Sequence, residues 1–504
     1  MRDAQNLGDV VAAHDEDSST VAVVDLRNPE EPVQVTHRDL ARMAGGVAAH
    51  LAGRGLRPGE RVGILALNRV EYLAAYFGAM LAGGVAVPLS IKLPAESLAY
   101  IIDDAGLRLA FVDAGRRHLV PPGLDVVDFD DPGPDGFAAS VVAQEFAAVE
   151  PPDGAEAELL YTSGSSGRPK GVSLTHAGQL WALRTMAATR PAQRHTQILA
   201  QPLFHMNGLV TVALALLSAD TVILQPAFAA GPYAAAIEHY AVDTVAAVPT
   251  MWVRTLREAE AGRADLSSVR TLTLGSAPTS DELIARTRAL LPECRVSLSY
   301  GTTEAGPAVF GPHPDGLPTP PRALGYPLPG SDLRLVDGPS PDEGVLLMRN
   351  PAVMRGYHNL PERTSAVVRD DWYTSGDVMR RDEDGFYTFV GRADDMFVCA
   401  GENIYPGEVE RLLERNPAVH QAAVVSLPDP ERGRIPVAFV VPVDDRPLDA
   451  ASVKEHALRH GAPHLHPRRV SFRPDLPLAG TNKTDRNALA QLAIELERTH
   501  GWSP

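Results

Sequence analysis

Apolar strands alternate with amphipathic helices along the first half of this chain, and that alternation constrains its fold most. Residues 61–67 have the apolar pattern of a buried strand, residues 69–81 that of a helix, and residues 85–89 that of a second strand. A helix that connects two strands at this spacing makes the strands parallel. The alternation continues between residues 223 and 299. The sequence therefore predicts an α/β fold built on parallel sheets.

The length of the chain and its change of texture predict more than one domain. A chain of 504 residues is too long for one ordinary hydrophobic core. We expect a large N-terminal domain of βαβ sheets, residues 1–393. Its residues 318–390 have short strands between Gly, Pro and Asp turns, which predicts a small antiparallel barrel. Residues 394–504 are expected to form a smaller α+β domain, and the Pro-, Asp- and Gly-rich segment 130–154 a surface linker.

Charge and cysteine content exclude several classes of function. A formal charge of −17 argues against nucleic-acid binding, because such binding needs many cations to neutralise phosphates. Cys294 and Cys399 are far apart and lack histidines at metal-ligand spacing, so neither a disulfide nor a zinc site is expected. The N-terminus lacks a basic region followed by an apolar core, and no apolar run is long enough to span a membrane. We therefore expect a cytoplasmic protein.

The segment Leu-Leu-Tyr-Thr-Ser-Gly-Ser-Ser-Gly-Arg-Pro-Lys-Gly-Val, residues 159–172, is typical of a phosphate-binding loop. Its hydroxyl and backbone N–H groups can converge on phosphate oxygens, and Lys170 supplies positive charge. It differs from the loop of P-loop NTPases, because Pro169 precedes the lysine and Val172 stands where a Ser or Thr would begin a helix. The alternative is a flexible Gly/Ser loop. The predicted phosphate-binding residues are Thr162, Ser163, Gly164, Ser165, Ser166, Gly167 and Lys170.

Tyr300-Gly-Thr-Thr-Glu304 forms a second candidate segment. The tyrosine ring can stack on a purine, Thr303 can donate to the α-phosphate, and Glu304 offers the oxygen ligand that Mg²⁺ prefers. Asp377 can accept hydrogen bonds from ribose hydroxyls. The alternatives are an ordinary turn at a strand end for residues 300–304 and a capping or solvated carboxylate for Asp377.

These segments, with others in the same order, resemble the adenylate-forming superfamily of acyl-CoA synthetases, nonribosomal adenylation domains and luciferases. The resemblance extends over nearly the whole chain. The further matching segments are Pro202-Leu-Phe-His-Met-Asn-Gly208, Val248-Pro-Thr-Met251, Gly275-Ser-Ala-Pro278, Ser375-Gly-Asp377, Gly391-Arg-Ala-Asp-Asp395, Gly401-Glu-Asn-Ile-Tyr-Pro406 and the terminal Lys483.

The resemblance implies an AMP-forming acid–thiol ligase that uses ATP, Mg²⁺ and coenzyme A. The acid would attack the α-phosphorus of ATP and release pyrophosphate, and coenzyme A would then displace AMP. Lys483 would neutralise the two anions that meet in the first step. A mobile C-terminal domain would swing about Asp394 between the two steps, and the turn at Gly401 would line the thiol tunnel.

The resemblance also assigns residues to each part of the site. His205, which in isolation fits a core histidine equally well, would gate the thiol channel. The catalytic residues would be Lys483, Thr303, Glu304 and His205. The remaining nucleotide-binding residues would be Gly275, Ser276, Ala277, Pro278, Tyr300, Gly301, Thr302, Asp377 and Arg392. The acyl pocket would comprise His205, Met206, Asn207, Thr250, Gly275, Gly301 and Ala305, and coenzyme A would meet Ala400, Gly401, Glu402, Arg432 and Arg434.

Several positions depart from the usual text of the superfamily, and they leave the balance of the two half-reactions open. Ala400 and Asn482 stand where relatives often have Gly, and Val345 and Arg434 where Glu is usual. Alternatives are an enzyme that performs one half-reaction together with a partner ligase, one that loads a separate carrier protein, and a silent nucleotide-binding regulator. No cation is evident among the pocket residues, which favours an apolar acyl or aryl acid.

Overall fold

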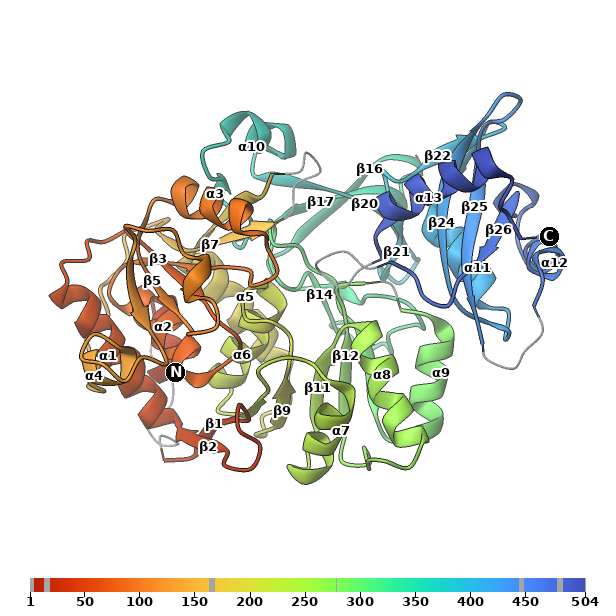
Figure 1. Ribbon diagram of the computed structural model, residues 1–504. Helices are drawn as coiled ribbons and strands as arrows, with labels where there is room; N and C mark the ends of the chain where they lie inside the picture. Colours follow the sequence, from red (N-terminus) through yellow and green to blue (C-terminus); the bar gives the residue numbers. More distant parts are fainter. Residues whose placement is uncertain are drawn as a thin grey trace.

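The computed structural model describes residues 4–12, 19–162, 168–277, 279–443, 448–477 and 484–503. Figure 1 shows two large sheets side by side, an antiparallel sheet above them, and the C-terminal elements, in blue, as a separate lobe at one end. The α/β fold class predicted from the sequence is confirmed. No helix in these ranges is long and apolar enough to cross a membrane.

The first sheet carries the predicted strand–helix–strand unit. Its strand order within the described residues is β18-β8-β7-β4-β3-β5-β6, and β3 pairs in parallel with both β4 and β5. Strands β8 and β18 extend it by antiparallel pairing. Its strands are β3 (Arg61–Leu65), β4 (Val85–Pro88), β5 (Leu107–Val112), β6 (Asp125–Asp128), β7 (Glu156–Thr162), β8 (Lys170–Thr175) and β18 (Gly356–Tyr357).

Helices beside this sheet follow from their caps and apolar faces. Helix α1 begins after Thr36, whose hydroxyl accepts a hydrogen bond from the backbone N–H of Asp39. Helix α2 is buried at every position except Glu71, so it forms the centre of the largest core. The elements in this part are η1 (Leu7–Ala12), α1 (His37–Gly53), α2 (Val70–Leu81), α3 (Ala95–Ala105), η2 (Arg117–Leu119), α4 (Phe137–Ser140) and α5 (His176–Ala188).

The segment 130–154 packs more closely than a surface linker would. Gln144 donates its backbone N–H to the carbonyl of Arg42, at 2.9 Å. A Cβ atom on Gly45 would lie 2.2 Å from the carbonyl oxygen of Gln144. The segment connects β6 to β7, two strands of the same sheet, and it lies on α1 because two glycines of that helix leave room for its backbone.

The second sheet has the strand order β13-β12-β11-β9-β10-β1-β2 within the described residues, and its pairs are parallel except for the antiparallel pair of β1 and β2. Trp252 is fully buried in its core and donates to Thr287. The strands are β1 (Val21–Asp25), β2 (Val33–Thr36), β9 (Thr196–Leu199), β10 (Thr221–Leu224), β11 (Thr244–Ala247), β12 (Thr271–Leu274) and β13 (Arg295–Leu298). The helices are α6 (Met206–Leu217), α7 (Ala230–His239), α8 (Pro249–Glu260) and α9 (Asp281–Leu290).

Residues 310–392 hold antiparallel strands, as the turn-rich sequence of residues 318–390 predicts, but the pairings among the described residues do not close the predicted barrel. The sheet order is β16-β17-β20-β19, and β21 pairs with β20. The elements are β14 (Phe310–Gly311), β15 (Tyr326–Pro327), β16 (Asp332–Ser340), β17 (Glu343–Arg349), α10 (Pro361–Val367), β19 (Val368–Arg369), β20 (Trp372–Arg381) and β21 (Tyr387–Arg392).

The C-terminal elements pack around a hydrophobic core of their own, whose buried members all lie between Phe397 and Ala493. The predicted boundary at residues 393–394 falls between β21 and β22 and stays a prediction. The elements are β22 (Phe397–Cys399), β23 (Glu402–Ile404), α11 (Pro406–Glu414), β24 (Val419–Asp429), β25 (Gly433–Pro442), α12 (Ala450–His460), η3 (Pro463–Leu465), β26 (Arg469–Phe472) and α13 (Arg486–Thr499).

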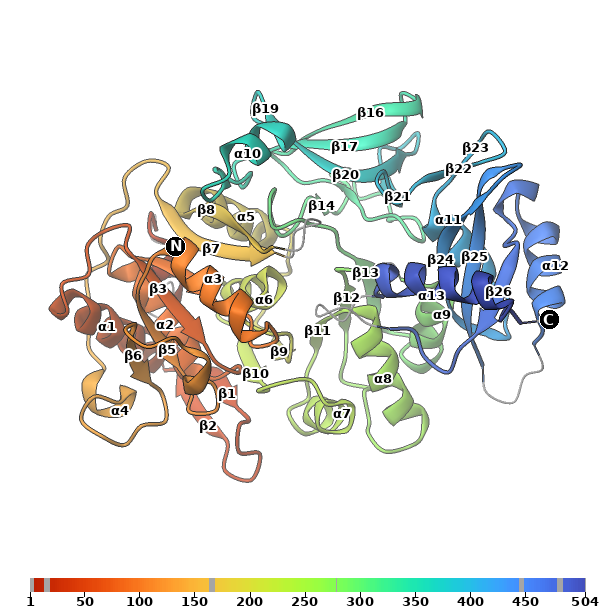
Figure 2. The same ribbon diagram turned by 45° about the horizontal axis from the view of Figure 1, so that its top comes forward.

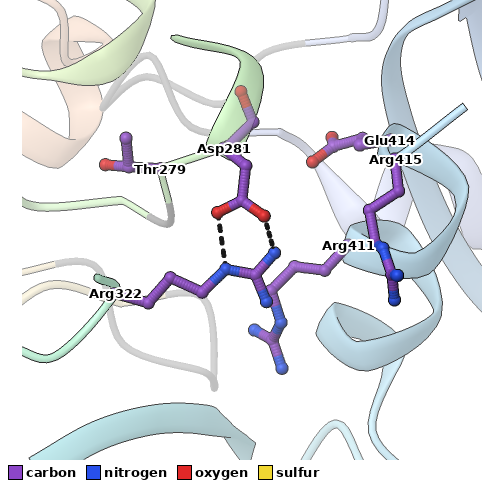
Figure 3. Close-up of a pocket in the computed structure, with 7 residues that line it drawn as sticks. Thr279, Asp281, Arg322, Arg411, Glu414 and Arg415 are labelled. Carbon is purple, nitrogen blue, oxygen red and sulfur yellow. Dashed lines mark hydrogen bonds and ion pairs between the residues drawn. The ribbon is translucent and has the colours of Figure 1, made fainter. Parts of the chain in front are cut away.

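Polar groups line the contact between this lobe and the rest of the protein. Figure 2 shows α11 next to α9 and β21. Arg411 donates to the carbonyl of Val390 at 2.9 Å, and the guanidinium of Arg257 lies 2.9 Å from Nε2 of His420. In the small pocket of Figure 3, Arg322 pairs with Asp281. The pocket is lined by Thr279, Ser280, Asp281, Arg322, Arg411, Glu414 and Arg415.

Glu414, which lines this pocket, has a raised pKa. Burial raises its pKa to about 8, and the neighbouring carboxylates of Glu410 and Glu282 add to the rise. The backbone N–H of Ala422, which donates to its Oε1 at 3.1 Å, and the cation of Arg411 act in the opposite direction. Glu414 therefore binds a proton on folding. Its contribution to the free energy of unfolding falls progressively as pH rises from about 4.5 towards 8.

The hairpin between β22 and β23 turns on Ala400 and Gly401. Both residues have positive φ, 52° and 90°, and they connect the paired residues Cys399 and Glu402. This is a two-residue turn of the type that favours glycine at both positions. Ala400 is exposed, so what its methyl group costs here is backbone strain and not a steric overlap.

We expect Ala400→Gly to raise the free energy of unfolding by up to about 1 kcal/mol, because glycine adopts positive φ without strain. Urea unfolding of the two proteins measures the difference. The control is Ala451→Gly in α12, where the same exchange at an exposed helical position should lower stability by up to about 1 kcal/mol. A lower free energy of unfolding in Ala400→Gly than in the parent protein would show that the backbone of Ala400 is not strained.

We expect Glu414→Gln to flatten the pH dependence of stability. The amide keeps an acceptor for Ala422 and needs no proton, so the variant should exceed the parent protein in stability at pH 9 by at least about 1 kcal/mol and match it at pH 4. Urea unfolding at both pH values tests this. Glu495→Gln, an exposed change on α13, should show no such pH-dependent gain. Equal differences at both pH values would rule out titration of Glu414 as the cause.

Candidate active site

The candidate phosphate loop connects two adjacent strands of the first sheet. Thr162 ends β7 and Lys170 begins β8, and the two residues pair directly across the ladder. The residues after Lys170 continue as a strand, so no helix N-terminus follows the lysine, in agreement with the departure from the P-loop pattern. The predicted phosphate-binding residues Ser163, Gly164, Ser165, Ser166 and Gly167 lie outside the described residues.

Lys170 and Glu304 come together at the end of this hairpin. The ammonium of Lys170 lies 3.6 Å from Oε1 of Glu304. Both side chains contact the hydroxyl of Tyr357, which accepts from Lys170 at 2.7 Å and donates to Glu304 at 2.9 Å. Burial and the Glu304 carboxylate raise the pKa of Tyr357, so the phenol keeps its proton. Tyr357 is not predicted from the sequence, because no local pattern marks a residue whose partners lie so far away in the chain.

Asp377 joins Tyr300 to Arg392 in a second polar group. Asp377 is only 6% exposed, and its Oδ2 accepts from the hydroxyl of Tyr300 at 2.5 Å. Its Oδ1 accepts from Arg392 at 3.0 Å, and the guanidinium of Arg392 also binds both carboxylate oxygens of Asp394. Hydrogen bonding to Asp394 is the main cause that raises the pKa of Arg392. A chain of contacts thus runs from Tyr300 to the predicted hinge residue.

The carboxyl ends of neighbouring parallel strands bring together much of the predicted nucleotide and acyl site. Strands β11, β12 and β13 are parallel, and Thr250, Gly275 and Gly301 follow their respective ends. Ligands of parallel α/β sheets bind at this edge. A Cβ atom on Gly275 would lie 2.2 Å from Oγ of Ser299, and one on Gly301 would lie 2.2 Å from the carbonyl of Pro307. Gly301 therefore permits a backbone approach that a side chain would prevent, whereas the nearest atom at Gly275 is a serine hydroxyl that can turn away.

The first turn of α6 faces the same edge. Nδ2 of Asn207 lies 3.5 Å from Oγ of Ser276. The backbone of Ser276 has a positive φ of 65°. His205 caps α6, and its ring contacts Phe204 at a centroid distance of 4.6 Å. Met206 is buried. Ala277 follows Ser276 in the same loop, and Pro278 lies outside the described residues.

The turn after β13 is held by its own backbone. Thr302 donates its N–H to the carbonyl of Gly306 and accepts at Oγ1 from the N–H of Ala305. Ala305 is fully buried, and its carbonyl accepts from Asn350 at 3.0 Å. Thr303 lies between these anchored residues, next to Glu304. The turn is therefore more than a solvated strand end.

The predicted coenzyme A residues lie on the C-terminal lobe. Ala400, Gly401 and Glu402 are exposed at the β22–β23 hairpin. Ala400 donates its N–H to the carbonyl of Arg432 at 3.0 Å, so Arg432 lies beside the turn. Arg434 instead donates to Oγ of Ser426 at 2.7 Å. Lys483 lies outside the described residues.

Comparison with known proteins gives the family. Residues 11–358 match the family described as AMP-binding enzyme, and residues 408–483 match the AMP-binding enzyme C-terminal domain. The chain is 35% identical to a feruloyl-CoA synthase of an Amycolatopsis species over 89% of this chain and 92% of that protein. It is 30% identical to the fatty acid–[acyl-carrier-protein] ligase ScoC of Streptomyces coeruleorubidus, over 90% of this chain and 91% of that one.

Solved structures agree with these matches. The anthranilate CoA ligase AuaEII in complex with anthranoyl-AMP superposes with a TM-score of 0.87 at 25% identity, covering 97% of each chain. ATP-bound MatB from Rhodopseudomonas palustris gives a TM-score of 0.87 at 28% identity, covering 97% of this chain and 98% of that one. Its apo form gives 0.79 at the same identity and coverage. This chain therefore belongs to the AMP-binding enzyme family, as an AMP-forming acid–thiol ligase of the acyl-CoA synthetase type.

Proposed function

We propose that this enzyme activates an aromatic or other apolar carboxylic acid with Mg²⁺-ATP and transfers the acyl group to coenzyme A. The observation that carries the proposal is the placement of Lys170 and Glu304, 3.6 Å apart at the tip of the candidate phosphate hairpin. A cation for phosphate and an oxygen ligand for a metal are the two groups that a metal-bound triphosphate requires. Asp377, joined to Tyr300, would meet the ribose beside them.

The adenylation step needs charge neutralisation more than covalent help. A carboxylate oxygen attacks the α-phosphorus, the bond to the bridging oxygen breaks, and pyrophosphate leaves with the electron pair. Lys170 would bind the departing phosphates, Thr303 would donate to the α-phosphate, and Lys483 would reach both anions. Asp377, which accepts hydrogen bonds from Tyr300 and Arg392, would meet the ribose hydroxyls.

The residues present fit a magnesium ion delivered with ATP. Mg²⁺ is usually held by one or two carboxylates together with substrate phosphates, so Glu304 alone is a sufficient protein ligand. The ion would supply neutralisation of the triphosphate charge. Glu304 is held for this by the turn of residues 302–306 and by a backbone bond from Met354 to its carbonyl, at 2.8 Å.

Thioester formation requires the lobe to move, because Lys483 and the thiol would approach the same adenylate. The thiolate would attack the acyl carbonyl, and the bond to AMP would break. The higher TM-score to the ATP-bound MatB structure than to its apo form supports assigning the present arrangement to the adenylation step. Asp394 would be the hinge, and the exposed hairpin of Ala400 and Gly401 would approach the pantetheine after rotation.

The acid class is supported from two directions. The predicted pocket residues carry no cation that would bind a second carboxylate, and Met206 and Ala305 give apolar buried surface. The chain is similar to a feruloyl-CoA synthase and to an anthranilate CoA ligase, both of which act on aromatic acids. The similarity to ScoC supports a second candidate, in which the acyl group goes to a carrier protein.

A substrate panel tests the proposal. Aromatic acids, fatty acids and dicarboxylates are each incubated with enzyme and Mg²⁺-ATP, and AMP release is measured with and without coenzyme A. We expect aromatic acids to give coenzyme A-dependent AMP release and an acyl-CoA product. AMP release that requires a carrier protein in place of coenzyme A would favour the second candidate. ATP binding without any acid-dependent turnover would indicate a silent regulator.

We expect Lys483→Ala to reduce acid-dependent pyrophosphate exchange at least 100-fold, because the meeting anions would lose their neutralising ammonium. Thioester formation from a supplied acyl-adenylate should stay within about threefold of the parent enzyme, because Lys483 would be displaced in that step. Lys454→Ala on α12 is the matched control and should leave both rates unchanged. Equal loss of both half-reactions in Lys483→Ala would contradict the assigned role.

A further inference from the structure

We propose that Tyr357 is a positioning residue of the adenylation site, which holds Lys170 and Glu304 ready for the triphosphate and its metal. This inference rests on the proposed function. Lys170 donates to the hydroxyl of Tyr357 at 2.7 Å, and the hydroxyl donates to Oε1 of Glu304 at 2.9 Å. The ammonium also lies 4.0 Å from the centroid of the Tyr357 ring. One phenol thus contacts both charged groups.

The numbers of hydrogen-bond donors and acceptors explain why a phenol suits this position. A hydroxyl has one proton to donate, and here it goes to the carboxylate while the oxygen accepts from the ammonium. Lysine has three donors, so two remain for phosphate oxygens. Glu304 keeps its second oxygen for a metal. The bridging hydroxyl therefore satisfies both groups without consuming the valences that a ligand needs.

Without the hydroxyl, the existing ion pair of Lys170 and Glu304 would be free to shorten. The two charged groups are already 3.6 Å apart, and their exposed fractions are 22% for the Lys170 side chain and 13% for that of Glu304. In such a partly buried place the pair would tighten if nothing stood between them, because the attraction of opposite charges grows as they approach. A closed pair would have to be broken before ATP and metal could bind.

The backbone around Tyr357 fixes the phenol relative to both partners. Tyr357 pairs with Val172 of β8, two residues beyond Lys170. Met354, three residues earlier, donates its N–H to the carbonyl of Glu304 at 2.8 Å. Tyr357 itself donates its N–H to Oγ1 of Thr364 at 2.8 Å. The short segment 354–358 therefore attaches the lysine strand to the glutamate turn, and the side chain completes the same connection.

The test variant is Tyr357→Phe, which removes only the hydroxyl oxygen and keeps the ring, its contact with the ammonium and the backbone pairing. We expect its KM for Mg²⁺-ATP in pyrophosphate exchange to rise about tenfold, and the Mg²⁺ concentration for half-maximal rate to rise about fivefold. Thioester formation from a supplied adenylate should stay within about twofold of the parent enzyme, because that step uses neither triphosphate nor its metal.

Tyr76→Phe, in α2, is the matched control. Its hydroxyl donates to a carboxylate, Oε2 of Glu158, at 2.7 Å, so the variant loses a comparable bond. We expect wild-type Mg²⁺ dependence from it. A double-mutant cycle adds a second criterion: in the Glu304→Gln background, Tyr357→Phe should change the dissociation constant for Mg²⁺-ATP at least threefold less than in the parent enzyme.

Two outcomes would overturn the inference. One is a wild-type KM and Mg²⁺ dependence in Tyr357→Phe, and the other is an equal effect of that substitution in both backgrounds. Calorimetric binding of Mg²⁺-ATP serves as the readout of the cycle, because it does not depend on turnover. A parent enzyme that binds Mg²⁺-ATP but shows no acid-dependent exchange would therefore refute the proposed function, while the cycle would still decide the role of Tyr357.

Discussion

The antiparallel pairing of β8 with β18 is the constraint on which the candidate site depends. It brings a two-residue strand from the edge of the antiparallel region onto the first parallel sheet, 187 positions away from Lys170. Without that pairing, Lys170 would end a hairpin in solvent and Glu304 would belong to a separate turn. With it, a cation and a carboxylate from distant parts of the chain share one hydroxyl. The site is thus a product of sheet topology, with residues contributed by strands whose order in space differs from their order in sequence.

A second carboxylate extends the arrangement to the boundary between the two predicted domains. Asp377 and Arg392 are direct partners across β20 and β21, and the same guanidinium reaches Asp394. Asp377 is buried, so its charge is tolerated only because Tyr300 and Arg392 both donate to it. Any rotation about Asp394 must therefore act against the bonds that Arg392 makes, and Arg392 in turn contacts the residue proposed to meet the ribose. This gives a physical route by which the state of the nucleotide site and the position of the lobe can influence each other.

The sequence predicted those features that are local. The strand–helix–strand unit β3-α2-β4 follows from the pattern of apolar residues, and it is confirmed. Features that depend on contacts between distant segments were missed. Strand β18 is too short to show alternation, Tyr357 has no local signature, and the docking of segment 130–154 depends on glycines in another helix. The consequence of Ala400 also needed the structure, since only the backbone angle shows that the position is left-handed. The roles assigned to Lys483 and to the loop of residues 163–167 stay predictions from the resemblance, because those residues lie outside the described ranges.

The chemistry of the contact between lobe and large domain fits a lobe that has to move. The lobe buries its apolar residues in its own core, so it does not need the large domain to cover them. Several contacts with the large domain are polar: Arg411 bonds a backbone carbonyl, Arg257 bonds His420, and Arg322, already paired with Asp281, lies near Arg411 and Glu414. Water can replace such contacts at little net cost, whereas exposing an apolar interface costs about 25 cal/mol for each Å². An interface of this composition therefore holds one orientation without making it irreversible, which is the condition that two successive reactions at one adenylate impose.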